Sequence, residues 1–176
     1  GFKWLHDDLG SNYRMTEMQA AIGREQLRSL DIQIKKRNLI VNLYLNELKD
    51  YYLKYDILKK PDFKFKTYPL KKNSKKSNQY IHAFYRLNLF INKNKVKQNK
   101  LIQQLIKNKI NCGVGSCPEI YREKVFKKLK FYPKKRLVNA KILGETSIMF
   151  PINPNIALTT VKSEINSIKR ILKSYL

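Results

Sequence analysis

One polar stretch near the N-terminus constrains the fold more than any other part of this 176-residue sequence. It runs from Gly10 to Leu27 and reads GSNYRMTEMQAAIGREQL. Thr16 is followed three residues later by Gln19, a spacing typical of a capping box, in which two side chains satisfy free amides at the start of a helix. The pattern therefore predicts a helix that begins near Thr16 and a preceding loop that is held firmly in place.

Small side chains occupy the first two turns of this expected helix. Ala20 and Ala21 are followed by Gly23, and a glycine inside a helix costs roughly 1 kcal/mol relative to alanine. Such a cost indicates that another part of the protein packs closely against the helix at this point. We therefore expect a tight contact over Gly23.

Periodic apolar residues indicate how the rest of the chain is organised. From Met18 to Tyr55 the spacing indicates two helices, or one bent helix, joined around Leu30 and Asp31. The clearest strand is expected from Ile81 to Ile91, where apolar and polar residues alternate. One face of this strand would carry Ala83, Tyr85, Leu87, Leu89 and Ile91, and the other would carry His82, Arg86 and Asn88.

The second half of the chain reads as short helices and strands in alternation. We expect a helix after Val96, a strand at 110–115, partial helix at 118–129, a helix at 137–143, a buried strand at 147–150 and a last helix from Thr159 or Thr160. This order predicts an α/β fold with a small sheet covered by helices.

Composition narrows the possible classes of protein. The sequence contains no apolar run long enough to cross a membrane and no secretory signal pattern, so we expect a cytoplasmic protein without a membrane partner. Cys112 and Cys117 have no neighbouring histidine, and we assign neither a disulfide nor a metal site. The net charge of +24 is mostly lysine spread along the whole chain, which favours mutational bias over a nucleic-acid footprint.

The stretch from Gly10 to Leu27 resembles a segment of the DegT/DnrJ/EryC1/StrS family, the sugar aminotransferases that depend on pyridoxal phosphate (PLP). Family members carry G-x-N-x-R-M-T-E-x-Q-A-A-x-G-x-x-Q-L there. The resemblance continues through 115–121 and 144–150. It implies the C-terminal part of a fold-type I PLP-dependent transferase, with residues 1–58 ending the large domain and residues 59–176 forming the small domain. The lysine that bonds to PLP would lie upstream of this chain, so no catalytic residue is assigned within it.

The resemblance also implies roles for individual residues. Asn12 would donate a hydrogen bond to the PLP phosphate of the other subunit, which requires a homodimer with a cross-subunit active site; without the resemblance, Asn12 could simply cap a turn. Family members often place a His-Tyr pair where this chain has Gly115 and Ser116, so the sugar contacts here would differ. Candidate substrate-binding residues are Tyr13, His82, Ser116 and Tyr121, although His82 and Tyr121 could equally be structural.

The implied reaction transfers an amino group from an amino acid, with glutamate expected, to a keto-sugar nucleotide, with PLP as electron sink. Its products would feed polysaccharide or glycoside biosynthesis. Two alternatives stay open: a basic nucleic-acid-binding module, and a free-standing small domain without catalysis. Strong salt-dependent binding to DNA or RNA would favour the first of these.

Overall fold

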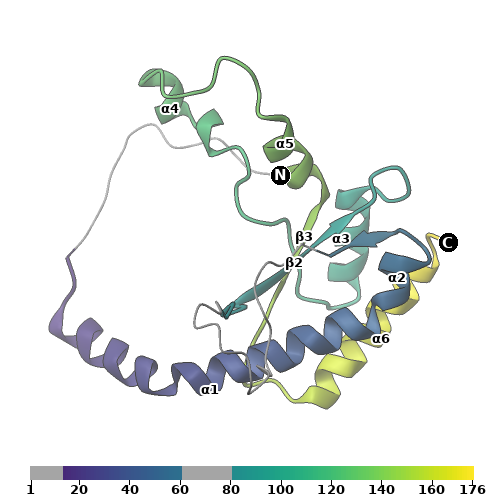
Figure 1. Cartoon of the computed structure of the whole chain (residues 1–176), viewed down its shortest axis with the longest axis horizontal. Coiled ribbons are helices and arrows are strands. Elements are labelled where there is room, and N and C mark those ends of the chain that lie inside the picture. Colours follow the sequence, from purple (N-terminus) through teal and green to yellow (C-terminus); the bar gives the residue numbers. More distant parts are fainter. Residues whose placement is uncertain (1–13, 61–80) are drawn as a thin grey trace, which may run out of the picture.

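A computed structural model describes residues 14–60 and 81–176 of the chain (Figure 1). Its elements, in chain order, are α1 (Glu17–Glu47), α2 (Lys49–Leu53), β1 (Leu58–Lys59), β2 (Arg86–Ile91), α3 (Gln98–Lys107), the 3-10 turn η1 (Ile120–Arg122), α4 (Lys124–Lys128), α5 (Val138–Thr146), β3 (Ser147–Pro151) and α6 (Leu158–Lys173). Helices therefore predominate around a small sheet, as the sequence predicted.

The sheet is antiparallel, with strand order β1-β2-β3. In its register, Leu87 lies opposite Phe150 and Leu89 lies opposite Ile148. These four side chains are buried, and because side chains alternate along a strand they share one face of the sheet. The intervening residues, among them Arg86 and Asn88, belong to the opposite face.

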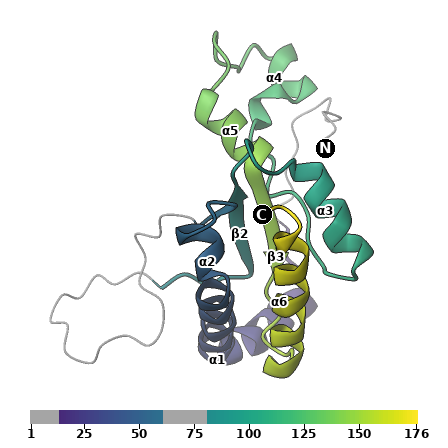
Figure 2. The same cartoon turned by 90° about the vertical axis from the view of Figure 1, so that its right-hand side faces the viewer.

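The core lies between the apolar face of the sheet and the helices α1 and α6, which run side by side (Figures 1 and 2). The rings of Tyr44 on α1 and Phe150 on β3 are 5.7 Å apart. As predicted, α6 buries Val161, Ile165, Ile168 and Leu172. Ile57 and Leu58 share this core, and the proposed domain division at residue 59 stays a prediction. Among the described residues, none of the helices is both long and apolar enough to span a bilayer.

Helix α1 confirms the predicted capping box. The Thr16 amide donates to Gln19 Oε1 at 2.8 Å, and the Gln19 amide donates to Thr16 Oγ1 at 3.3 Å. The helix runs without interruption through Leu30 and Asp31, where the sequence suggested a joint, and ends only at the Leu48 cap. Of the two alternatives, two separate helices joined at this point is therefore wrong, and a single helix covers both sides of Leu30 and Asp31.

The strand predicted from Ile81 to Ile91 is shorter than expected and begins only at Arg86. Phe84 has a positive φ of 44°, a conformation that breaks the alternation of an extended strand. As a result Phe84 is buried, whereas Tyr85 is 57% exposed. The assignment of Tyr85 to the core face was therefore wrong, and His82 lies before the strand instead of on it.

Between α3 and α5 the chain leaves the sheet. The strand expected at 110–115 is reduced to one bridge, in which Gly113 pairs with Met149 of β3. Residues 116–137 then form an excursion that carries η1 and α4 and lies apart from the core in Figure 1. The helix predicted at 137–143 extends to Thr146 as α5.

Candidate functional site

The polar face of β2 carries a guanidinium group. Arg86 donates from Nη1 to Ser116 Oγ at 3.0 Å, and its guanidinium lies 4.4 Å from the centre of the Tyr85 ring. Ser116 opens the excursion, so this contact ties the excursion to the sheet. A serine hydroxyl held by an arginine can present donors to an anionic or hydroxylated ligand.

The backbone beside this contact requires a glycine. The Gly115 amide donates to Ser147 Oγ at 3.2 Å, and a Cβ on Gly115 would lie 2.9 Å from that oxygen. Asn88 Oδ1, which would lie 3.7 Å from the same Cβ, is buried and has no hydrogen-bond partner among the described residues. Gly115 is therefore needed for a close approach of the chain to Ser147 and Asn88.

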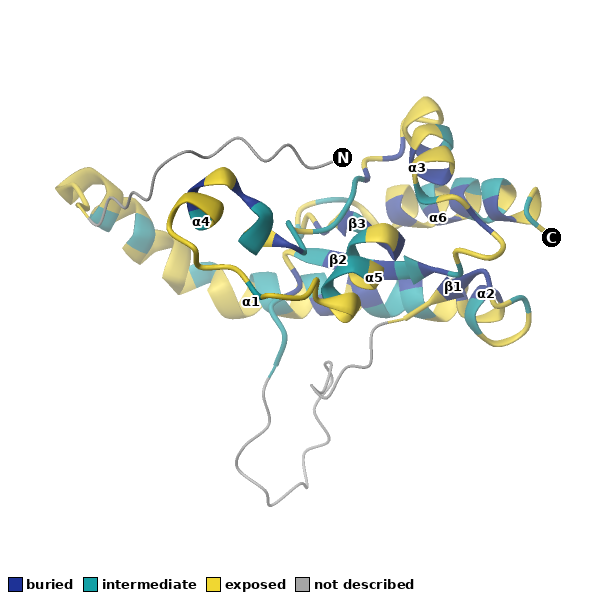
Figure 3. Cartoon of the chain, turned by 90° about the horizontal axis from the view of Figure 1, so that it is seen from above, coloured by how far each residue is buried: buried dark blue, intermediate teal, exposed yellow. Residues whose placement is uncertain are grey.

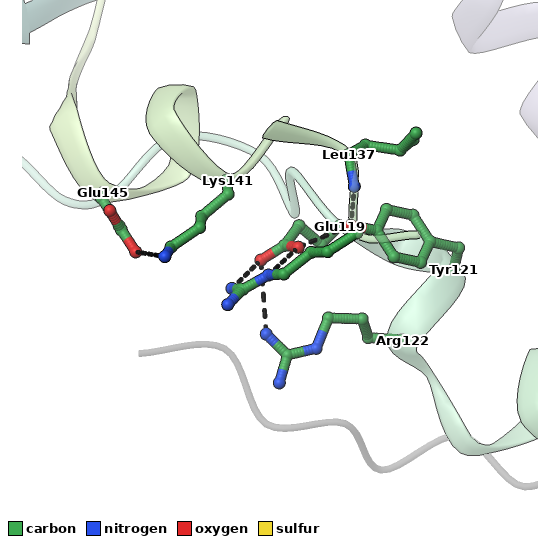
Figure 4. Close-up of polar contacts among 7 residues, drawn as sticks. Glu119, Tyr121, Arg122, Leu137, Lys141 and Glu145 are labelled. Atoms are coloured by element: carbon green, nitrogen blue, oxygen red, sulfur yellow. Dashed lines mark hydrogen bonds and ion pairs between the residues drawn. The ribbon is translucent and has the colours of Figure 1, made fainter. Parts of the chain in front are cut away.

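The carboxylate of Glu119 organises the rest of the excursion (Figure 4). Tyr121 donates its hydroxyl to Glu119 Oε1 at 2.6 Å. Arg136 grips both oxygens, from Nε to Oε1 at 2.7 Å and from Nη2 to Oε2 at 2.6 Å. Arg122 adds a bond from Nη1 to Oε2 at 3.3 Å. One buried carboxylate thus joins the beginning and the end of the excursion.

The environment of Glu119 favours its charged form. Hydrogen bonds from Arg136, together with those from Tyr121 and Arg122, lower the pKa of Glu119 to about 2 despite the opposing effect of burial. The same pair raises the pKa of Arg136. Both groups are charged throughout the neutral range, so the link does not depend on pH there.

Tyr121 and Pro118 fix the excursion to α5. The Tyr121 oxygen accepts a hydrogen bond from the Leu137 amide at 3.1 Å, at the start of that helix. Pro118 lies so close to Gly144 that a Cβ there would be 2.4 Å from Pro118 Cγ. An ion pair between Lys141 and Glu145, 3.8 Å long, runs along the same helix (Figure 4). The excursion is therefore anchored at several points.

The structure brings some of the predicted site residues together and separates others. Ser116 and Tyr121 lie on the same excursion, each in a hydrogen bond. His82 lies elsewhere: its Nδ1 accepts from the Phe84 amide at 3.0 Å, and burial lowers its pKa. Asn12 and Tyr13 lie outside the described residues. A role for any of these residues in binding stays a prediction.

Sequence reasoning did not single out Glu119 or Arg136, and it placed Arg86 only on the polar face. A usable signal was present in Lys134-Lys135-Arg136, where an arginine stands in a lysine run. Arginine can grip a carboxylate with two parallel bonds, which lysine cannot do. Arg136 makes such a pair of bonds with Glu119.

The described residues offer donors for anions more readily than ligands for metals. In the ranges 14–60 and 81–176, no group of three His, Cys, Asp or Glu side chains is gathered in a way that could hold a metal ion. Arg86, Arg122 and Arg136 supply guanidinium donors around the excursion. Guanidinium groups of this kind bind phosphates and carboxylates, and Arg122 and Arg136 already bind the carboxylate of Glu119.

Comparison with known families places the chain among aminotransferases. The model of the DegT/DnrJ/EryC1/StrS aminotransferase family matches residues 1–169. The match includes both the capped start of α1 and the excursion.

The known proteins that resemble this chain in sequence or structure are longer than it is. The chain is 28% identical over 171 residues to the uncharacterized protein MJ1066 of Methanocaldococcus jannaschii, covering 96% of the chain and 40% of that protein. An aminotransferase from Psychrobacter cryohalolentis has a TM-score of 0.76 and 28% identity, over 99% of this chain and 43% of its own.

A GDP-4-keto-6-deoxymannose-3-dehydratase with a trapped PLP-glutamate geminal diamine has a TM-score of 0.65 and 20% identity, over 91% of this chain and 37% of its own. These structural neighbours are fold-type I PLP enzymes, which confirms the predicted fold class. The chain spans less than half the length of the proteins it matches.

Proposed function

Because this chain belongs to the DegT/DnrJ/EryC1/StrS aminotransferase family, we propose that it forms the C-terminal portion of a PLP-dependent sugar aminotransferase. The enzyme would move an amino group from an amino acid, with glutamate as the expected donor, to a keto-sugar nucleotide. The observation that carries this proposal is the family match over residues 1–169. We place the enzyme in the cytoplasm and its product in polysaccharide or glycoside biosynthesis.

The chemistry of one side chain fits the expected cofactor. The amide of Asn12 can donate hydrogen bonds to a phosphate, and the capping box fixes the backbone four residues later at Thr16. In our proposal Asn12 holds the PLP phosphate of a neighbouring subunit, so the enzyme acts as a homodimer. PLP, when bound, would supply the electron sink for amino transfer, and the lysine that bonds to it would lie outside this chain.

The excursion would contribute to the sugar pocket. Ser116, held by Arg86 at 3.0 Å, presents a hydroxyl at the polar face of the sheet. Tyr121 is engaged by Glu119 and Leu137, so it would act by shaping this wall of the pocket. The position of Ser116 after Gly115, in place of the family's common His-Tyr pair, would leave more room for the sugar.

The absorbance spectrum of the full-length protein, purified with added PLP, tests the proposal. We expect a visible band from protein-bound PLP that shifts when glutamate is added. Asn12→Ala should lose PLP faster on dialysis, because the phosphate loses a donor. Asn166→Ala, which removes an exposed amide on α6, is the matched control and should retain PLP. A full-length protein with no band would contradict the proposal and favour the non-catalytic alternative.

A further inference from the structure

The charge of the excursion is concentrated at the turn that ends α4. We call residues 127–135, which read KKLKFYPKK, the basic turn. It contains five lysines and no acidic residue, and all five lysines are exposed. The two carboxylates of the excursion, Glu119 and Glu123, are buried, and its eight Lys and Arg residues leave it with a net charge of +6. The surface of the excursion is therefore strongly positive.

Large apolar side chains are exposed among these lysines. Phe131 is 66% exposed, Tyr132 is 53% exposed and Leu129 is 42% exposed. They follow α4, which lies at the end of the excursion that is farther from the sheet (Figures 1 and 2). The basic turn therefore combines apolar side chains with cations on a part of the molecule that projects from the core.

The backbone of the basic turn is fixed by hydrogen bonds. The Lys130 amide donates to Lys127 O at 3.2 Å, and the Phe131 amide donates to Phe126 O at 2.9 Å. These two bonds, with the positive φ of 58° at Lys130, form a Schellman motif at the C-terminus of α4. Glycine adopts such a φ most easily, and a lysine stands there instead. The motif thus fixes the backbone at an exposed cation and at the exposed ring that follows it.

We propose that the basic turn binds the surface of a membrane that contains anionic phospholipids. Phe131, Tyr132 and Leu129 would enter the headgroup region, where aromatic rings are favoured. The lysines would stay at the level of the lipid phosphates, which attract each of them over about a Debye length.

Binding at the membrane surface needs no spanning helix, so it agrees with the lack of one among the described helices. The proposal replaces the expectation of a protein without a membrane partner, which was based on the lack of a long apolar run. It does not depend on the proposed aminotransferase function.

Two observations favour lipid over nucleic acid as the partner. Leu129 is aliphatic and cannot stack on a base, but it can enter a headgroup region. The two arginines of the excursion, whose planar groups suit nucleic-acid phosphates, are bound to the Glu119 carboxylate. Mutational bias accounts for lysine along the whole chain, but it does not account for the exposure of Phe131 among the lysines of this turn.

Vesicle co-sedimentation of the full-length protein tests this surface. The vesicles contain phosphatidylcholine alone or with roughly one third phosphatidylglycerol, and binding should be at least about tenfold stronger to the second kind. Lys134→Ala should weaken it about fivefold through the loss of one cation, and Phe131→Ala roughly fivefold through the loss of apolar burial. Lys107→Ala and Ile106→Ala, at an exposed cation and an exposed apolar residue of α3, are the matched controls and should bind normally.

Several results would overturn the membrane site. Failure to bind anionic vesicles would do so, as would equal binding to both kinds of vesicle or equal losses in Lys134→Ala and Lys107→Ala. Tighter binding of a single-stranded oligonucleotide than of anionic vesicles, weakened in Phe131→Ala, would assign the basic turn to nucleic acid. The PLP absorbance band is recorded in the same samples. A protein that binds anionic vesicles through Lys134 and Phe131 but shows no PLP band would retain the membrane site and lose the proposed function.

Discussion

The two halves of α1 belong to one continuous helix but have different surroundings (Figure 3). In the inner half, residues 33–47, Asn38, Ile40, Val41 and Tyr44 are buried against α6 and the sheet. In the outer half, residues 17–32, no residue is buried. Met18 is 76% exposed there, and Ile22, four residues later on the same side, is 63% exposed. One helix therefore has a packed half and a bare half.

The difference shows that helix formation and burial have separate causes. The outer half depends on local features such as the Thr16 capping box and the Glu25 to Arg28 ion pair, which contribute little individually. The inner half is stabilised by tertiary packing, which supplies most helix stability in proteins. Within the described residues nothing lies within 4 Å of a Cβ added to Gly23. The close contact expected over Gly23 is thus not made by any of them.

The largest expected effect is the difference in stability between two variants, each of which shortens an isoleucine in one half of α1. Ile40→Ala should lower the free energy of unfolding of this chain by about 3 kcal/mol, because Ile40 is only 3% exposed. Ile22→Ala should change it by less than about 0.5 kcal/mol. Urea denaturation of both variants measures the difference.

Repeating this pair in the full-length protein sharpens the comparison. If Ile22→Ala becomes costly there, the outer half is covered in the complete enzyme. Equal costs for Ile22→Ala and Ile40→Ala in the isolated chain would contradict the division of α1 into a packed and a bare half.

The next effect comes from a buried amide at the edge of the packed half. Asn38 is fully buried, and its Nδ2 donates to Ile34 O and to His82 O, both at 2.9 Å. Asn38→Ala should cost about 2 kcal/mol, since it leaves the His82 carbonyl without this donor. Asn46→Ala, on an exposed position of the same helix, is the control for thermal unfolding. If Asn38→Ala lowers the stability no more than Asn46→Ala does, water would have replaced the hydrogen bond from Asn38 to the His82 carbonyl.

Sequence patterns located the elements of the fold where the governing interaction is local. The Thr16 capping box and the apolar face of α6 follow from residues three or four positions apart, and both were predicted correctly. The start of β2 depended on the positive φ of Phe84. A positive φ is rare at a residue other than glycine, and the alternation of apolar and polar residues gives no sign of it.

The candidate site was less predictable for the same reason. Ser116 and Tyr121 were chosen from a resemblance, and the structure adds the partners that hold them. Glu119 and Arg136 are 17 residues apart, so their pairing depends on the path of the excursion between them. Spacing rules for helices and strands reach only a few residues and cannot identify such a pair.

A smaller change in stability is expected when Gly23, in the bare half of α1, is replaced by alanine. Gly23→Ala should stabilise the outer helix by about 1 kcal/mol, because the added methyl meets no described atom within 4 Å. Hydrogen exchange of the amides at 19–27 should slow. Gly144→Ala is the contrasting variant: its Cβ would lie 2.4 Å from Pro118 Cγ, so it should loosen the excursion. Faster exchange in Gly23→Ala would contradict an open surface, and loss of stability only in the full-length protein would indicate a close neighbour there.

The smallest effect is a difference in pH dependence at the packed half. Glu164 on α6 accepts a hydrogen bond from Tyr44, and burial raises its pKa above the ordinary 4.5. The folded state therefore holds the Glu164 proton more tightly than the unfolded state does. Below about pH 4.5 the burial of this carboxyl does not reduce the free energy of unfolding. As pH rises through its folded pKa, the free energy of unfolding falls.

Glu164→Gln should accordingly gain stability at pH 7, on the order of 1 kcal/mol at most, and gain nothing at pH 4. Glu47 on α1 is the matched comparison, because its pKa is shifted in the opposite direction. Its hydrogen bond and ion pair with Lys169 of α6 lower its pKa, so its contribution is present above about pH 4.5 and is lost as pH falls. Thermal unfolding of Glu164→Gln and of Glu47→Gln at pH 4 and pH 7 measures this contrast. If Glu164→Gln were less stable than the parent at pH 7, the charged carboxylate would stabilise the contact between α1 and α6, and the cost assigned to its burial would be wrong.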